Sequence, residues 1–168
     1  MLVAAAICPA PPMLVPELAA GAAAELADAR TACSDALSVL AASRPDLLVV
    51  VGACDQDQHG SYPQGARGTF RGFGAGAEAD VRLGDGEESP RRLPTTLALG
   101  AWLLGRAGWG AAPVEGLGVA EPLDTARCLE TGRELASRAA RVALLVMGDG
   151  SACRSLKAPG YFDERAAA

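Results

Sequence analysis

The chain has one histidine, few aromatic residues and no long apolar run. His59 is the only histidine in 168 residues, and aromatic side chains make up 4% of the sequence. With 50% apolar residues and so few aromatics, we expect a core built largely from alanine, valine and leucine. No segment reaches the roughly 18 to 20 apolar residues that a membrane-spanning helix needs, so we expect no membrane partner.

Positive charge is also scarce. The net charge of −5 and the pI near 4.9 argue against a nucleic-acid groove or an anionic membrane surface as the partner. Met1–Ile7 is apolar but has no basic leader, and prolines follow at once, so we expect a strand there rather than a signal peptide. Five cysteines without a regular framework suit a reducing compartment, which predicts a cytoplasmic protein.

Three unbroken apolar runs predict the strands of a buried sheet. They are Leu2–Ile7, Leu47–Val51 and Val142–Met147, and Pro113–Val119 is a further candidate strand. Unbroken apolar runs are typical of parallel strands covered on both faces, so we expect these three to be parallel neighbours or near-neighbours.

Helical patterns separate these strands. The predicted helices are Glu17–Ser43, Leu93–Ala107 and Glu121–Ala140. Gly52–Gly76 reads as a long loop with one short strand near Thr69–Phe73, and Glu78–Leu83 as an edge strand. The order of elements predicts one wound α/β domain over residues 1–168, with a mainly parallel sheet and helices on both faces. Ligands of such sheets bind at the carboxyl edge.

Cysteines follow the predicted core strands. Cys8, Cys54 and Cys153 are expected at one edge of the sheet, near His59 and Asp149. Thiolate and imidazole groups are ligands that zinc and iron prefer, so one interpretation is an Fe(II) or Zn(II) site. Because no CxxC or HxH spacing occurs, the other interpretation is that these cysteines only fill space at strand ends.

His59 and Asp149 are the candidate catalytic residues. His59 has an ordinary pKa near neutrality and suits a general base or a ligand, but also a solvated loop position. No GxSxG sequence supports a serine nucleophile. Gly148–Ser151 could form an anion-binding nest, but it lacks the GK[ST] ending of a phosphate loop, so nucleotide binding is not expected.

Three segments together resemble the class III extradiol ring-cleavage dioxygenases, in particular the LigB-like branch and the related Memo proteins. Ile7–Glu17 is similar to the family's opening I-x-P-H-P-P-x-L-x-P-E, and Asp46–Cys54 to its D-x-x-V-V-I-S-P-H strand. Gly148–Ser151 with Lys157–Tyr161 is similar to its G-D-x-S-H and A-P-x-G-Y stretches. The order and spacing agree and frame nearly the whole chain, so the resemblance implies a LigB-like fold.

The resemblance also implies a ferrous site that this sequence does not complete. The family holds iron with two histidines and a carboxylate, and a further histidine acts as acid and base. The opening histidine is Ala10 here, the strand-end histidine falls on Cys54, and the acid–base histidine is Ala152. The resemblance implies a pocket that includes Ala10, Gly148, Ser151, Ala152 and Lys157.

The family's C-terminal strand and helix, with the carboxylate ligand, have no counterpart before Ala168. We therefore expect an uncovered sheet edge or apolar face, and a homo-oligomer that buries it.

Two functions follow from these observations. The first is a LigB-like protein that has lost ferrous-dependent ring cleavage and acts as a binding or partner protein, with no cofactor. The second is an active metal-dependent oxidoreductase of the extradiol type, whose replaced Fe(II) or Zn(II) site uses His59 with Cys8, Cys54 and Cys153. If Cys8, Cys54 and Cys153 lie at one edge near free backbone N–H groups, we expect them to react faster than Cys33 and Cys128, which fall within predicted helices.

Overall fold

A five-stranded sheet forms the centre of the computed structural model, which describes residues 1–76, 79–120, 123–158 and 161–167. The strand order is β1-β8-β2-β7-β3. The strands are β1 (Leu2–Cys8), β2 (Leu47–Cys54), β3 (Gly60–Tyr62), β7 (Val114–Ala120) and β8 (Val142–Met147). All pairs are parallel except β3 with β7. The predicted α/β class with a mainly parallel sheet is confirmed.

The three apolar runs are neighbours, as predicted. β8 pairs in parallel with β1 on one side and with β2 on the other. β1 is the edge strand of the sheet. One of its faces is uncovered, since Ile7 is 76% exposed. That part of the prediction is wrong. An apolar run does not distinguish a central strand from an edge strand of which only the Ala4, Ala6 and Cys8 face packs into the core.

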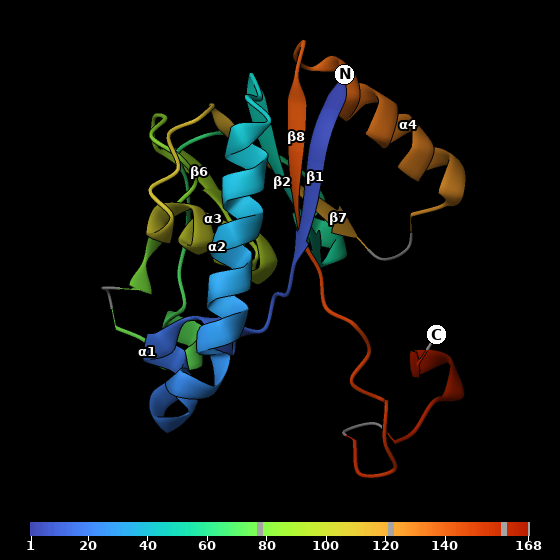
Figure 1. The fold of residues 1–168 in the computed structure, drawn as a ribbon. Helices are drawn as coiled ribbons and strands as arrows, with labels where there is room; N and C mark the ends of the chain where they lie inside the picture. Colours follow the sequence, from blue (N-terminus) through green and yellow to red (C-terminus); the bar gives the residue numbers. More distant parts are fainter. Residues whose placement is uncertain (77–78, 121–122, 159–160, 168) are drawn as a thin grey trace.

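Helices lie on both faces of the sheet (Figure 1). α2 (Ala27–Ala42) and α3 (Thr95–Arg106) pack against one face and form the larger core. α3 approaches the sheet closely because Gly100 has no side chain; a Cβ there would lie 2.5 Å from Val50 Cγ1. α4 (Thr125–Ser137) lies on the other face, where Leu135 is its one buried residue in the described chain. The second face is therefore covered only in part.

The helices are shorter than predicted. In place of one helix over Glu17–Ser43 the chain forms α1 (Pro16–Ala19), the 3₁₀ segment η2 (Ala20–Leu26) and α2. Gly21 lies in η2, where its backbone freedom weakens a regular helix. α4 begins after Asp124, whose side chain accepts a hydrogen bond from the Arg127 N–H at 2.8 Å. Residues 121–122 of the predicted third helix lie outside the described residues.

The region between β2 and α3 forms a second, three-stranded sheet in the order β5-β4-β6. Its strands are β4 (Ala66–Gly68), β5 (Val81–Arg82) and β6 (Ser89–Arg92). The strand predicted near Thr69–Phe73 is wrong, because η4 (Arg71–Phe73) is a 3₁₀ turn and the strand precedes it. The edge strand predicted over Glu78–Leu83 is reduced to β5, with Glu78 outside the described residues.

The remaining elements are 3₁₀ turns: η1 (Pro12–Leu14), η3 (Gln56–Gln58) and η6 (Glu164–Ala167). The segment after β8 runs away from the sheet, on the side opposite the N-terminus (Figure 1). In the described ranges, no helix combines the length and apolar character needed to cross a bilayer.

Candidate functional site

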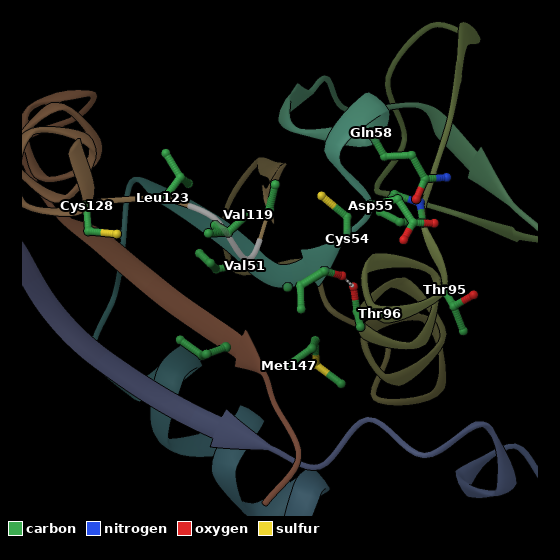
Figure 2. A pocket seen from close by; sticks show the side chains of 15 residues that line it. Val51, Cys54, Asp55, Gln58, Thr95, Thr96, Val119, Leu123, Cys128 and Met147 are labelled. Atoms are coloured by element: carbon green, nitrogen blue, oxygen red, sulfur yellow. Dashed lines mark hydrogen bonds between the residues drawn. The ribbon is translucent and has the colours of Figure 1, made fainter. Parts of the chain in front are cut away.

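A cleft of about 770 Å³ lies at the carboxyl ends of β2, β7 and β8 (Figure 2). It extends from the first turn of α3 on one face of the sheet to the start of α4 on the other. This is the edge at which parallel α/β sheets bind ligands. The volume is in the range of roughly 300 to 1,000 Å³ that small-molecule sites occupy.

One side of the cleft is apolar. Val51 from β2, Val119 from β7 and Leu123 before α4 gather there (Figure 2). Val146, near the end of β8, extends this wall, whereas Met147 lies near Thr96 on the α3 side of the sheet (Figure 2). Val51 and Val119 are only half-buried, because α4 does not cover the carboxyl end of the sheet. An apolar ligand would remove this exposed surface from water.

The other side of the cleft is polar, and includes Asp55, Gln58, Thr95 and Thr96 (Figure 2). Thr96 Oγ1 donates a hydrogen bond to the Ala53 carbonyl at 2.6 Å. The contact requires a glycine at position 52, where a Cβ would lie 2.5 Å from Thr96 Oγ1. The first turn of α3 is thereby fixed against the end of β2.

Cys54 lies between the two sides (Figure 2). Its Sγ occupies space that Gly118 leaves free, since a Cβ at Gly118 would lie 2.8 Å from it. Burial raises the pKa of the Cys54 thiol, the Asp55 carboxylate raises it further, and the Arg91 guanidinium partly opposes the rise. The thiol is therefore protonated at neutral pH, and is a weak nucleophile and a weak metal ligand.

Arg91 and Tyr62 hold the loop that carries the polar side. The Arg91 guanidinium donates to the carbonyls of Gln58 at 3.0 Å, His59 at 2.7 Å and Ser61 at 2.8 Å. It also lies 4.1 Å from the centre of the Tyr62 ring. The Tyr62 hydroxyl donates to the Gln58 carbonyl at 2.6 Å, and burial raises its pKa. These contacts fix the loop in place before any ligand binds.

His59 has a structural contact. The side chain is exposed, and its Nδ1 accepts a hydrogen bond from the Ala120 N–H at 3.3 Å. The contact joins the loop after β2 to the end of β7.

Asp149 also binds backbone. Its Oδ1 accepts a hydrogen bond from the Ala10 N–H at 2.7 Å, and the Gly148 N–H donates to the Cys8 carbonyl at 3.0 Å. The segments after β1 and β8 therefore lie side by side. They carry the first and third of the three stretches that resemble the extradiol family. Ala10 is buried, whereas Ala152 is exposed in the C-terminal segment.

The other predicted pocket residues do not line the cleft. Ser151 and Lys157 are exposed in the C-terminal segment, and Gly148 is half-buried at its start. None of the five residues that the resemblance assigns to a pocket is among the residues lining the cleft in the described chain. Of all the predicted site residues, Cys54 alone lines it there.

Cys8 and Cys54 end β1 and β2 at the carboxyl edge of the sheet, as predicted, but Cys8 contacts Cys33 of α2. Cys8 is 1% exposed and its neighbour Cys33 is 2% exposed; burial and the contact with Cys33 raise the pKa of Cys8 to about 12. Cys153 is half-buried in the C-terminal segment. Cys128 and Cys54 both line the cleft. This was not predicted, because no local sequence pattern indicates where α4 lies on the sheet.

These positions do not fit the ferrous site that the resemblance implies. Ala10 and Ala152 offer only methyl groups, and the Nδ1 of His59 is already a hydrogen-bond acceptor. In the described part of the chain, no three His, Cys, Asp or Glu side chains come together in a way that could hold a metal ion. The donor set therefore lacks the two histidines and one carboxylate that such iron needs.

Comparison with known proteins adds no assignment: no protein-family model matches the chain, and no curated protein is significantly similar to it.

Proposed function

We propose that this chain is a LigB-like protein that has lost ferrous-dependent ring cleavage and acts as a binding protein for a small molecule. The observation that carries this proposal is the cleft of about 770 Å³ at the carboxyl ends of β2, β7 and β8. Its polar side is fixed by hydrogen bonds that need no ligand, such as that from Thr96 to Ala53. A site fixed in advance loses little conformational freedom on binding.

The walls favour a largely apolar molecule with one neutral, hydrogen-bonding end. Val51, Val119 and Leu123 would contact its apolar part, and Asp55, Gln58 and Thr95 its polar part. The Asp55 carboxylate accepts hydrogen bonds and repels anions. A phenol or an aryl alcohol meets both requirements better than a carboxylic acid of the same size.

Ring cleavage is not supported by the groups near this cleft. It needs open positions on a redox-active iron and an acid–base residue, whereas the cleft offers the protonated thiol of Cys54. The histidine of this region, His59, holds the end of β7 instead. The same walls can retain a neutral aromatic molecule without reacting with it.

The test compares binding with turnover. Protein loaded with ferrous ion is incubated aerobically with catechol, and a second sample is titrated with catechol and with benzoate by calorimetry. We expect saturable binding of catechol, weaker binding of benzoate and no yellow ring-opened product. Ring-opened product made by the wild-type protein would contradict the loss of activity, and absence of any catechol binding would contradict the binding role.

A pair of variants localises the binding. Val119→Phe adds bulk inside the cleft, and Val39→Phe adds the same bulk on α2, where Val39 is 66% exposed. Val119→Phe should weaken catechol binding at least about tenfold, while Val39→Phe should leave it unchanged. Equal affinities in both variants would place the bound molecule outside the cleft.

A further inference from the structure

β1 forms an open edge of the central sheet. It pairs with β8 on one side, and in the described ranges no hydrogen bond reaches its backbone from the other side. Its seven residues, Leu-Val-Ala-Ala-Ala-Ile-Cys, include no charged residue and no proline. Natural edge strands usually carry such residues, or are short or covered, because a bare edge pairs with other chains.

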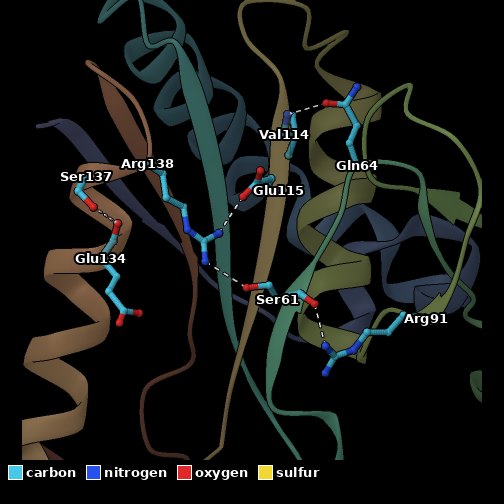
Figure 3. Close-up of polar contacts among 8 residues, drawn as sticks. All are labelled: Ser61, Gln64, Arg91, Val114, Glu115, Glu134, Ser137 and Arg138. Carbon is cyan, nitrogen blue, oxygen red and sulfur yellow. Dashed lines mark hydrogen bonds and ion pairs between the residues drawn. The ribbon is translucent and has the colours of Figure 1, made fainter.

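The opposite edge of the same sheet is protected. β3 has only three residues, and Pro63 follows it. The Ser61 carbonyl accepts from Arg91, and the Ser61 hydroxyl accepts from the Arg138 guanidinium at 3.1 Å (Figure 3). Arg138 also pairs with Glu115 of β7 at 2.7 Å (Figure 3). A short strand with two arginines bound to it cannot readily accept another strand, so the two edges differ sharply.

The backbone of β1 shows which groups are free to pair. The Cys8 carbonyl faces β8, since it accepts from the Gly148 N–H. Backbone groups of successive residues point to alternate sides of a strand, so those of Ile7 and Ala5 point away from β8. The pairing with β8 is irregular between Leu2 and Ala4, and Pro9 follows β1, so the regular part is Ala4–Cys8.

We propose that β1 pairs antiparallel with β1 of a second copy of this chain, about a twofold axis at Ala6. This register places Ala5 of one copy opposite Ile7 of the other, so that both residues exchange N–H and C=O bonds with their partners. The two five-stranded sheets then form one continuous sheet through a C₂ interface.

The side chains agree with this register. Ile7 is 76% exposed, and an alanine opposite it leaves room for its branched side chain. The two Ile7 side chains are diagonal neighbours across the axis, a separation that long side chains bridge. β1 itself carries no charge, so pairing it with its own copy brings no like charges face to face within the strand.

The experiment measures mass and amide exchange in solution. Light scattering should give twice the 17.0 kDa of one chain at micromolar concentration. Ile7→Lys introduces a charge on the exposed side of β1, and Ala5→Pro removes an N–H that faces away from β8. Each should raise the dissociation constant of the dimer at least about tenfold. Phe73→Lys, at a residue that is 52% exposed in η4, is the matched control and should leave it unchanged.

Circular dichroism and thermal melting establish that each variant is folded. In the wild-type protein, exchange of the Ala5 and Ile7 amides should slow as protein concentration rises, because these amides are bonded only in the dimer. A wild-type chain that stays monomeric would overturn the proposal. So would a dimer that both β1 variants leave intact, or exchange of these two amides that does not depend on concentration.

Discussion

The Ala10 N–H donates a hydrogen bond to the Asp149 carboxylate, with 2.7 Å between N and Oδ1. These residues are 139 positions apart and follow β1 and β8, the neighbouring strands of one sheet. The bond fixes the turn after β1 to the loop after β8. Asp149, a candidate catalytic residue in the sequence, thus has a defined structural role.

Asp149→Ala should lower the free energy of unfolding by about 1 kcal/mol, because a backbone N–H loses its acceptor. Asp149→Asn, which keeps an oxygen acceptor, should cost less. Urea denaturation measures both, with Asp85→Ala as the control, since Asp85 is also an exposed carboxylate. Equal stability of all three variants would show that the bond to Ala10 contributes nothing.

Cys8 should make stability fall at alkaline pH. Its pKa is raised from 9.0 to about 12 in the fold, first by burial and then by Cys33, so the folded protein keeps a proton that the unfolded chain loses. The stabilisation is fully present below pH 9.0 and is lost between there and about 12. The decline attributable to Cys8 should approach about 1.4 kcal/mol per pH unit.

Urea denaturation across this alkaline range, compared with Cys8→Ala, isolates the contribution of Cys8. The variant should show a shallower decline than the wild-type protein. Cys128→Ala, at an exposed cysteine, should decline as the wild type does. Parallel curves for the wild type and Cys8→Ala would contradict the burial of this thiol.

Gly118→Ala should be destabilising. Its Cβ would lie 2.8 Å from Cys54 Sγ and 3.0 Å from the Gln58 carbonyl, so the polar side of the cleft would have to move. The expected loss is about 1 to 3 kcal/mol of unfolding free energy. Gly105→Ala adds the same methyl group to α3 with nothing within 4 Å, and should stabilise by about 0.5 to 1 kcal/mol. A neutral Gly118→Ala would show that the thiol is not held in this space.

The strands were predictable from sequence because Leu47–Val51 and Val142–Met147 are unbroken apolar runs, which have few alternatives to a buried strand. The exposure of Ile7 was not, because strand order depends on contacts between residues far apart in sequence. The cleft was not predictable either. Val119 and Leu123 are ordinary apolar residues, and only the incomplete cover by α4 leaves them facing open space.

Thiol reactivity should follow exposure rather than position at a strand end. Cys128 is exposed, Cys54 and Cys153 are half-buried, and Cys8 and Cys33 are buried. Timed alkylation with peptide mapping should label Cys128 first and Cys8 and Cys33 last, which reverses the order expected from the sequence for Cys8 and Cys128. Fastest labelling at Cys8 would mean that the turn after β1 opens in solution.

The most direct test of the binding role is a titration of isotope-labelled protein with catechol, followed by amide and methyl NMR signals. Saturable shifts should be largest at Val51, Val119 and Leu123, which form the apolar side of the cleft, and absent at Val39 on α2. Val119→Phe should abolish the shifts at Val51 and Leu123. Linear, unsaturated changes at millimolar catechol, or saturable shifts that Val119→Phe leaves intact, would show that this cleft does not bind the molecule.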